Sequence, residues 1–189
     1  MPFVAKNKNT GERIDITQIV NPRVVLKKGT LVCPLCNEDL FIVAGLVRVH
    51  HFRHRIKCSS EWLHHPESIE HLTAKSIIAN YLRSRKDYKG RGVNIELEVP
   101  LEEINRQADI LVTFPTGWRV VHEVQLSSIT IEELQQRTFD YERLDIQTYW
   151  WLGKNAASET NIDWCEMAGI GCIEIEFSRR VVSKQILDK

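Results

Sequence analysis

The sequence has 189 residues, of which 43% are hydrophobic and 26% are charged, and its formal net charge at pH 7 is zero. This length suffices for one full domain and a small module, and the balanced charge argues against a broadly basic nucleic-acid-binding protein. The longest apolar run, FIVAGLV, is too short to span a membrane, and the first residues contain no apolar signal core. We therefore expect a globular protein of the reducing cytoplasm, with no membrane partner.

Charge is distributed unevenly along the chain. Residues 1–60 hold 10 Lys and Arg against 4 Asp and Glu, a net charge of +6, whereas residues 61–189 hold 15 against 21, a net charge of −6. This asymmetry would suit phosphate-binding charge in the first part and metal-binding carboxylates in the second. Chance scatter of surface charge explains it equally well.

The first part of the chain, residues 1–60, is predicted to be a small β-rich module. Four short β-like runs, IDITQIV, RVVLKK, TLVC and DLFIVAG, are separated by turn residues such as Asn21-Pro22 and Lys28-Gly29. The module has little apolar mass, so a bound metal would help it to fold.

Metal-ligand residues gather in this module. Cys33 and Cys36 form a Cys-x2-Cys pair, and the later segment VHHFRHRIKC adds His51, His54 and Cys58. An odd cysteine count in a chain without a signal core favours a metal over disulfides, and this spacing is typical of structural Zn²⁺. We expect Cys33, Cys36 and His54 as ligands and leave the fourth place open between Cys58 and His51. The alternative is a pair of reduced cysteines beside a basic loop.

A helix is predicted from about residue 67 to residue 85. Pro66 precedes its first turn, and Glu67 and Glu70 lie near its positive end. A linker with five Lys and Arg between residues 83 and 91 follows, and then the strand VNIELEVPL. This helix opens the second predicted domain, residues 61–189.

The segments QADILVTF and WRVVHEVQ flank a Pro-Thr-Gly turn and predict a β-hairpin. Asp109 lies in its first strand, and Glu123 and Gln125 lie at the end of its second. Because strand side chains alternate, Glu123 and Gln125 share a face that Asp109 can reach from the neighbouring strand. Two carboxylates and an amide at one spot suit a hard cation such as Mg²⁺ or Mn²⁺. The alternative is that these are surface groups at strand ends.

A second helix is predicted from about residue 131 to residue 144, because Thr130 and Glu133 form a capping-box pattern. The strand TYWWLG follows it, and the tail WCEMAGIGCIEIEF adds at least one more strand. From residue 67 onward the predicted α/β fold therefore has the order α-β-β-β-α-β.

This order, with Asp109 on the second strand and Glu123-Val124-Gln125 on the third, resembles the PD-(D/E)XK nuclease superfamily. The usual third-strand motif there is Glu-x-Lys, so Gln125 replaces a lysine. A closer resemblance is to the competence protein CoiA family. It rests on four local matches that occur in the expected order: Cys33-Pro34-Leu35-Cys36; His51-Phe52-Arg53-His54; Glu67-Ser68-Ile69-Glu70-His71 with Lys75; and Arg106-x-Ala108-Asp109-Ile110 with Glu123-Val124-Gln125.

The resemblance implies a metal-dependent DNA nuclease that acts in DNA recombination, in DNA uptake and processing, or in defence against foreign DNA. Asp109 and Glu123 would hold the metal, with the Val124 carbonyl as a further ligand and Glu70 as a ligand directly or through water. Gln125 would orient the attacking water or touch the phosphate. Glutamine cannot supply positive charge. The alternative is therefore a catalytically weak or inactive DNA-binding or recombination accessory protein that keeps the fold. If Gln125 occupies the lysine position, Gln125→Lys should be tolerated or should raise activity.

Basic side chains are expected to contact DNA phosphate, namely Arg53, Arg55, Lys57 and Lys75. Arg137 and Tyr141 match a Gln-x-x-x-Tyr motif of RecB-type nucleases with Arg in place of Gln, and they would contact phosphate as well. The ordinary interpretation of His71 and Lys75 is a solvated helix face. Many proteins of this fold act as homodimers, so a homodimer is also open.

Overall fold

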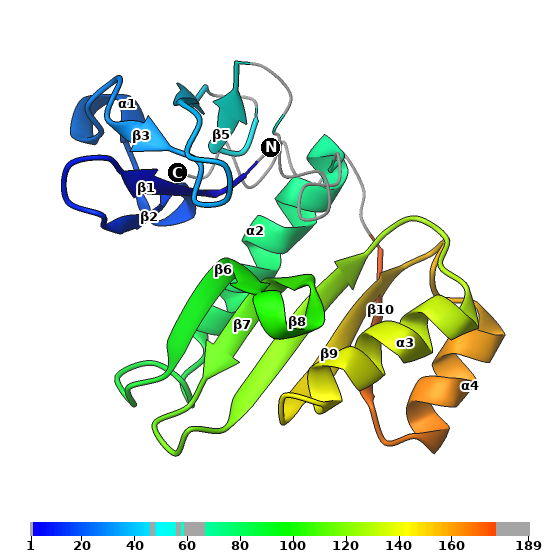
Figure 1. Ribbon diagram of the computed structural model, residues 1–189. Coiled ribbons are helices and arrows are strands. Elements are labelled where there is room, and N and C mark those ends of the chain that lie inside the picture. Colours follow the sequence, from blue (N-terminus) through cyan, green and yellow to red (C-terminus); the bar gives the residue numbers. More distant parts are fainter. Residues whose placement is uncertain (1, 46–47, 56–57, 59–66, 177–189) are drawn as a thin grey trace. The chain divides into compact units, whose positions relative to one another are not determined.

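The structure is a computed structural model that describes residues 2–45, 48–55, 58 and 67–176 (Figure 1). The chain forms two compact units, and the boundary between them lies between Ser76 and Ile77, inside helix α2 (Ile69–Ser84). The domain boundary predicted between residues 60 and 61 stays a prediction, because residues 59–66 lie outside the described residues. No helix among the described residues is long and apolar enough to cross a membrane.

The amino-terminal unit consists mainly of short strands (Figure 1). Its elements are β1 (Val4–Asn7), β2 (Arg13–Asp15), the 3-10 turn η1 (Ile16–Gln18), α1 (Pro22–Val25), β3 (Leu31–Val32), β4 (Leu40–Val43) and β5 (His51–His54). The strands form one sheet of order β2-β1-β3 and a second, antiparallel pair β4-β5. The predicted β-rich module is thereby confirmed.

The buried core of this unit is small, as its composition predicts. Its largest members are Phe3, Ile16, Leu31, Leu40 and Phe52, each at most 4% exposed. The start of the chain contacts β5, because the Phe52 N–H donates to the Pro2 carbonyl at 2.7 Å. A core of this size gives a module of this length little stability without a further constraint.

One predicted strand of this unit is wrong. The run RVVLKK begins in helix α1, where Val24 and Val25 are 85% and 66% exposed. Pro22 has a backbone φ suited to the first helical turn and has no N–H for a strand ladder, so it favours the helix over the strand. The central strand β1 was not among the predicted runs.

The second unit contains a five-stranded mixed sheet. Its elements after α2 are β6 (Asn94–Leu101), the 3-10 turn η2 (Glu102–Ile104), β7 (Arg106–Thr113), β8 (Arg119–Gln125), α3 (Ile131–Glu142), β9 (Ile146–Gly153), α4 (Glu159–Met167) and β10 (Gly171–Ile175). The strand order is β10-β9-β8-β7-β6, antiparallel among β6, β7 and β8 and parallel among β8, β9 and β10. The predicted α-β-β-β-α-β order is confirmed.

Local signals explain the elements that carry the site. Gly117 has a φ of +85°, a conformation that glycine adopts without strain, and it closes the β7-β8 hairpin where the turn was predicted. The Thr130 side chain accepts a hydrogen bond from the Glu133 N–H at 3.2 Å and caps α3. Both the hairpin and the start of α3 therefore lie where the sequence predicts them.

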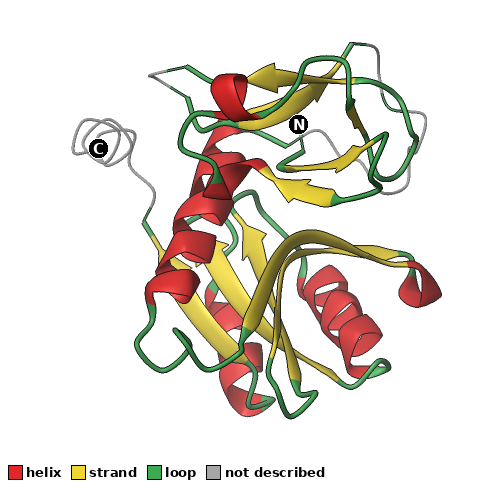
Figure 2. Cartoon of the chain, turned by 90° about the vertical axis from the view of Figure 1, so that its left-hand side faces the viewer, coloured by secondary structure: helices red, strands yellow, loops and turns green. Residues whose placement is uncertain are grey.

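Helices cover both faces of this sheet (Figure 2). On one face, Leu134 of α3 and Cys165 of α4 pack in one buried cluster with Trp150 of β9. On the other face, Tyr81 in the carboxyl-terminal half of α2 contacts Trp151 edge to face, with ring centroids 6.3 Å apart. Because Trp150 and Trp151 are neighbours on one strand, their opposite directions follow from strand alternation.

The tail contains the predicted strand, β10, and also helix α4, which was not predicted. Gly171 of β10 lies opposite Tyr149 of β9, and a Cβ atom there would lie 2.3 Å from the Tyr149 ring. Any larger residue at this position would therefore force the Tyr149 ring to move.

Candidate functional site

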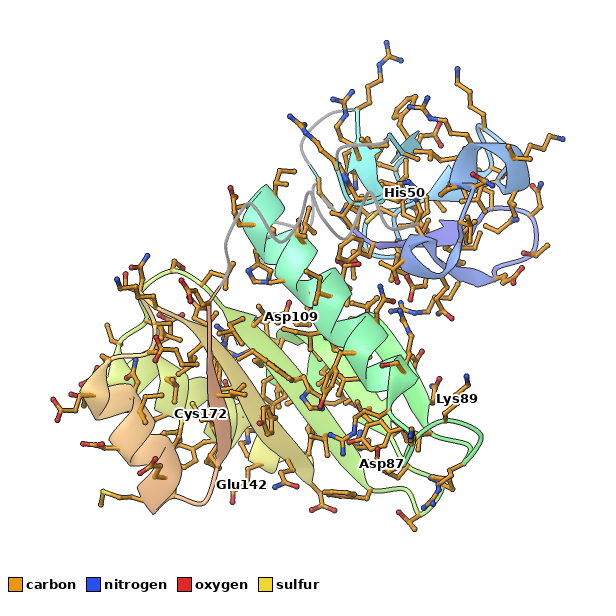
Figure 3. All side chains as sticks on the ribbon, turned by 180° about the vertical axis from the view of Figure 1, so that it is seen from behind. His50, Asp87, Lys89, Asp109, Glu142 and Cys172 are labelled. Carbon is orange, nitrogen blue, oxygen red and sulfur yellow. The ribbon has the colours of Figure 1, made fainter. Side chains whose placement is uncertain are left out.

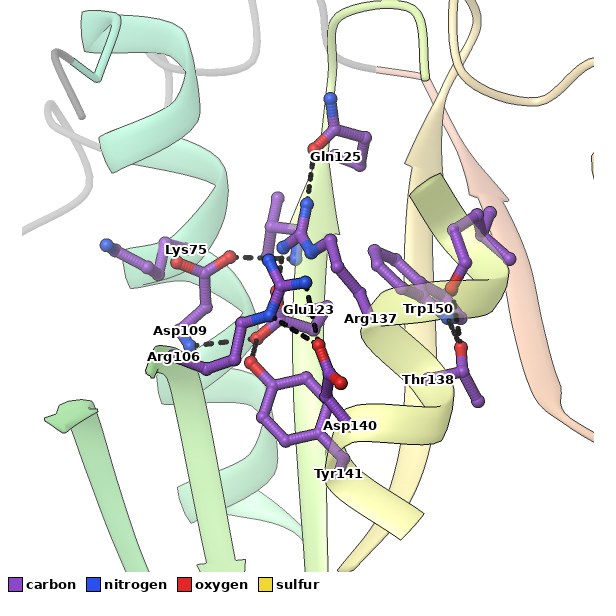
Figure 4. A network of polar contacts seen from close by, with 12 residues as sticks. Lys75, Arg106, Asp109, Glu123, Gln125, Arg137, Thr138, Asp140, Tyr141 and Trp150 are labelled. Carbon is purple, nitrogen blue, oxygen red and sulfur yellow. Dashed lines mark hydrogen bonds and ion pairs between the residues drawn. The ribbon is translucent and has the colours of Figure 1, made fainter. Parts of the chain in front are cut away.

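Asp109 and Glu123 meet where strands β7 and β8 separate (Figure 4). The regular pairing runs from Thr113 opposite Arg119 to Ile110 opposite His122 and stops there. The Asp109 N–H then donates to Glu123 Oε1 at 3.2 Å, and the Val124 N–H donates to Asp109 Oδ2 at 3.0 Å. At this point the backbone N–H groups of one strand donate to a carboxylate of the other strand instead of to a backbone carbonyl. The structure thus brings together the two carboxylates that the sequence predicts.

The Glu123 carboxylate is deeply buried, with only 1% of the residue exposed. The Tyr141 hydroxyl donates to its Oε1 at 2.8 Å, and the Arg137 guanidinium donates to its Oε2. Burial raises the pKa of Glu123 above its ordinary value, Arg137 opposes that shift, and the nearby Asp109 charge adds to it. Arg137 and Tyr141, predicted from sequence as DNA contacts, therefore lie within the acidic site itself.

Arg137 also contacts Gln125 and Trp150. Its Nη1 donates to Gln125 Oε1 at 3.2 Å, and its guanidinium lies 4.9 Å from the centroid of the Trp150 ring. Burial works against the charge of Arg137, but Glu123 raises the pKa of this guanidinium above its ordinary value. The amide of Gln125 is fixed from its other end, because its Nε2 donates to the Ser127 carbonyl at 3.0 Å.

A second ion pair borders the site, and its acidic member was not predicted. Arg106, at the start of β7, donates through Nε and Nη2 to Asp140 Oδ2 at 3.0 and 2.8 Å. Gln136 donates to the other oxygen, Oδ1, at 2.9 Å. Asp140 precedes Tyr141 and is 7% exposed. Its sequence signal is the i,i+4 spacing from Gln136, which is too common to single it out.

The donor set at the β7-β8 junction fits a divalent cation. Asp109 and Glu123 offer hard carboxylate oxygens, and their mutual repulsion contributes to the raised pKa of Glu123. A Mg²⁺ or Mn²⁺ ion would stabilise both charges at once. Glu70 lies in the first turn of α2, in the amino-terminal unit. Its contribution to metal binding therefore stays a prediction.

The predicted solvated helix face on α2 is wrong for Lys75. This residue is 1% exposed, and its Nζ donates to Glu67 Oε1 at 2.6 Å while lying 5.6 Å from the centroid of the Phe3 ring. Glu67 also lies 3.5 Å from His71 Nε2. A role for Lys75 in DNA binding stays a prediction, and it would have to compete with this ion pair.

The other basic side chains predicted to contact DNA lie in the amino-terminal unit. Arg53 and Arg55 are exposed to solvent. Lys57 lies outside the described residues. Their contact with DNA stays a prediction.

Four ligand-type side chains form a cluster in the amino-terminal unit. One ligand atom from each of Cys33, Cys36, His54 and Cys58 lies within 4.8 Å of the others. His51 is 2% exposed and its Nδ1 instead lies 2.9 Å from the Val49 carbonyl oxygen. Of the two residues between which the sequence left the fourth place open, Cys58 lies in this cluster and His51 does not, and zinc binding stays a prediction.

The backbone around Cys33 shapes this cluster. The Asn37 N–H donates to the Cys33 carbonyl at 3.0 Å, the Cys33 N–H donates to the Glu38 carbonyl at 2.9 Å, and Asn37 adopts a φ of +58°. The Leu35 N–H points at Cys33 Sγ, 3.4 Å away. This tight turn holds both cysteines of the Cys-x2-Cys pair beside His54, whose Nε2 lies 3.4 Å from Cys36 Sγ.

Without a metal, burial in this cluster favours the uncharged forms of its side chains. Burial raises the pKa of the Cys33 thiol to about 12 and lowers the pKa of His54. The histidine is therefore neutral near pH 7, the form that binds metal. A bound Zn²⁺ would reverse the Cys33 shift, since the thiolate is the ligand form of cysteine.

Two solved structures are similar to part of this chain. A repair endonuclease from Pyrococcus abyssi is 16% identical, with a TM-score of 0.38 over 61% of this chain and 50% of that one. The structure of an EndoMS–dsDNA2 complex is 12% identical, with a TM-score of 0.38 over 69% of this chain and 53% of that one. Similarity at this level assigns no activity to the chain.

Sequence relatives identify the family. Competence protein CoiA of Bacillus subtilis (strain 168) is 26% identical over 135 residues, which make up 71% of this chain and 34% of the relative. The chain thus spans about a third of the length of that relative. Residues 67–174, more than half of the chain, match the family described as competence protein CoiA, nuclease-like domain. The chain therefore belongs to this CoiA nuclease-like family.

Proposed function

We propose that this protein is a metal-dependent nuclease that hydrolyses DNA phosphodiester bonds. Asp109 and Glu123 hold a Mg²⁺ or Mn²⁺ ion, the Val124 carbonyl is a further ligand, and Glu70 completes the site. The observation that carries the proposal is the reciprocal pairing of the two carboxylates with the backbone of the opposite strand. Such an arrangement fixes two oxygen ligands side by side, one on the buried Glu123 and one on the half-buried Asp109, and a bound cation would offset the repulsion between their charges.

In the proposed reaction, the oxygen of a water molecule forms a bond to phosphorus and one phosphorus–ester oxygen bond breaks. The proton lost by the water ends on the leaving oxygen, so the products are an alcohol and a phosphomonoester. A bound divalent ion supplies charge neutralisation and a more acidic water. Asp109 and Glu123 hold their positions through the backbone bonds, and Tyr141 orients Glu123. The predicted role of Gln125 in orienting the attacking water would compete with its contacts to Arg137 and Ser127.

We further propose that Cys33, Cys36, His54 and Cys58 bind one structural Zn²⁺. The supporting observation is that their ligand atoms already lie within 4.8 Å of one another. Three sulfurs and one imidazole nitrogen form a common closed zinc site with no open position for chemistry. The metal would stabilise the small amino-terminal unit.

DNA is the proposed substrate, and its phosphates would contact basic side chains on both units. In the amino-terminal unit these are Arg53, Arg55 and Lys57. In the second unit they lie in the loop between α2 and β6, where Figure 3 labels Asp87 and Lys89. The setting would be DNA recombination, DNA uptake or defence against foreign DNA. A cytoplasmic location and a homodimer belong to the same proposal.

A second candidate is a DNA-binding accessory protein that keeps the fold but cleaves poorly. Two observations favour it. The motif ends in Gln125 instead of lysine, and Arg137 holds Glu123 Oε2, an oxygen that a metal would need. If this candidate is correct, the protein binds DNA in the presence and in the absence of divalent ions and leaves it intact.

Incubation of purified protein with single-stranded and double-stranded DNA in Mg²⁺, in Mn²⁺ and in EDTA separates the two candidates. A nuclease gives cleavage with at least one metal and none in EDTA. Binding without cleavage in both metals supports the accessory protein instead.

A further inference from the structure

The acidic site contains a buried cation that its strand motif does not supply. Gln125 ends the motif on β8, and Arg137 reaches the same face of the sheet from α3 (Figure 4). Strand alternation places Glu123 and Gln125 side by side on that face, and Arg137 donates to both of them. Positive charge is therefore present beside Glu123, but it comes from the helix.

The guanidinium of Arg137 is held on three sides. Glu123 Oε2 and Gln125 Oε1 accept its N–H groups, and the Trp150 ring lies beneath it at 4.9 Å. Only 17% of its side chain is exposed. Gln125 cannot turn its amide around without losing its bonds to the Ser127 carbonyl and hydroxyl at 3.0 and 2.9 Å. Gln125 thus presents to Arg137 an acceptor oxygen that a lysine at position 125 could not offer.

We infer that Arg137 supplies the positive charge that stabilises the phosphate during cleavage, and that Gln125 is the positioning residue that aims it. This inference rests on the proposed nuclease function. In the pattern Glu-x-Lys on the strand with Gln on the helix, the cation is on the strand. In this chain the two side chains have exchanged places, with the amide on β8 and the cation on α3.

Hydrolysis builds negative charge on the phosphate oxygens as the water oxygen bonds to phosphorus and before the ester oxygen leaves with its proton. A fixed guanidinium stabilises that charge, and its planar fork matches two phosphate oxygens. Arg137 and a divalent ion also share Glu123. Arg137 should therefore weaken metal binding while it speeds cleavage, and these two effects have opposite signs.

A purely structural role for Arg137 predicts something different. If its guanidinium only neutralised the buried Glu123 carboxylate, its loss would lower stability, and activity would fall only as far as folding fell. A lysine at position 125 would then restore stability without restoring the rate.

The test compares wild type with Arg137→Gln, Gln125→Lys and the double variant, in cleavage, Mn²⁺ calorimetry and thermal unfolding. We expect Arg137→Gln to cut the cleavage rate by about 100-fold or more, the loss typical of one charge-stabilising donor, and to bind Mn²⁺ more tightly. The double variant should recover at least about ten-fold of that rate and return Mn²⁺ affinity toward that of wild type, because it restores one cation per site.

Gln125→Lys alone should be slower than wild type, because its ammonium would face the Arg137 guanidinium. This reverses the expectation from the sequence alone, which did not contain that contact. Arg119→Gln is the matched control, since Arg119 donates to the Leu144 carbonyl elsewhere in the second unit. It should lower the melting temperature and leave both cleavage per folded molecule and Mn²⁺ affinity unchanged.

Three results would overturn the inference. The first is a double variant as slow as Arg137→Gln although both are folded. The second is Mn²⁺ affinity that falls in Arg137→Gln. Inert wild-type protein in every metal is the third, and it alone would also remove the proposed nuclease function.

Discussion

Tyr141 and Arg137 divide the two oxygens of the Glu123 carboxylate between them, so each residue has its own measurable effect. Tyr141→Phe removes a hydroxyl that donates at 2.8 Å to a carboxylate with 1% exposure. A lost hydrogen bond to a buried charged group should lower the free energy of unfolding by about 1.5–3 kcal/mol. Urea unfolding measures this change in the free energy of unfolding. Tyr81→Phe, at a side chain with 52% exposure, serves as the control. Equal losses in both variants would contradict the hydrogen bond's importance.

The burial of His122 should make the free energy of unfolding depend on pH. Burial lowers its pKa from 6.5 to about 4, Arg85 contributes to the shift, and the Trp151 N–H donates to its Nδ1 at 3.1 Å. The unfolded chain takes up a proton near pH 6.5, but the folded protein does so only near pH 4. The free energy of unfolding should therefore fall by on the order of 3 kcal/mol as pH decreases across this window. At pH values above the window the contribution of His122 to stability should be complete.

Denaturant unfolding at a series of pH values checks this pH dependence. His122→Gln should flatten the curve between pH 6.5 and about 4, because glutamine does not titrate there. An unchanged slope in the variant would assign the pH dependence to other groups.

At the level of elements, helix α3 carries both Arg137 and Tyr141, so its N-cap should affect the site. Thr130→Ala should lower the free energy of unfolding by about 1 kcal/mol and also reduce cleavage, because it loosens the helix that holds those side chains. Ser158→Ala is a matched control that removes the corresponding cap of α4, where the Asn161 N–H donates at 3.3 Å. It should cost similar stability and leave cleavage unchanged. Equal activity losses would show that general destabilisation, not α3, is responsible.

The elements that the sequence predicts correctly have strong local signals. The β7-β8 hairpin has a glycine turn, and α3 has a side-chain cap that closes at 3.2 Å. Helix α1 was misread because Val24 and Val25 suggest a strand, and only a partner strand could have made them one. Helix α4 was missed although Ser158 caps it, because its sequence has little amphipathic pattern.

The residues of the acidic site also divide into those with a local sequence signal and those that depend on tertiary contacts. Asp109, Glu123 and Gln125 follow from strand alternation, a rule that needs only the hairpin. The Arg106–Asp140 pair joins residues 34 positions apart and depends on how α3 packs against β7. That Cys58 rather than His51 joins the Cys33, Cys36 and His54 cluster depends on how the chain folds after β5, which ends at His54. Tertiary contacts of this kind are not encoded in local spacing.

For the whole molecule, zinc should decide whether the amino-terminal unit is folded. Elemental analysis of chelator-free protein should find about one zinc ion per chain, the stoichiometry of a closed structural site. Cys36→Ala should lose that zinc and lower the melting temperature of this unit, whereas Cys172→Ser, at a cysteine of β10 in the other unit, should keep the zinc. Metal-free protein with unchanged melting would contradict the zinc site.

DNA affinity should depend steeply on salt. If Arg53, Arg55 and Lys57 neutralise phosphates, exchanging all three for Gln should reduce the slope of log affinity against log salt by about 0.7–0.9 for each lost contact. The control set of equal charge consists of three exposed side chains of the same unit, Arg13, Arg23 and Lys27. An unchanged slope in the first variant would place the DNA elsewhere on the protein.

The central claim is that Asp109 and Glu123 together bind the metal that cleaves DNA. The most direct measurement is the rate of DNA cleavage in Mg²⁺ or Mn²⁺ by wild type, by Asp109→Ala and by Asp163→Ala, an exposed aspartate on α4. We predict cleavage by wild type and by Asp163→Ala and none by Asp109→Ala, which should bind DNA as tightly as wild type or more tightly because negative charge has been removed. Cleavage by Asp109→Ala at the full rate would contradict the claim.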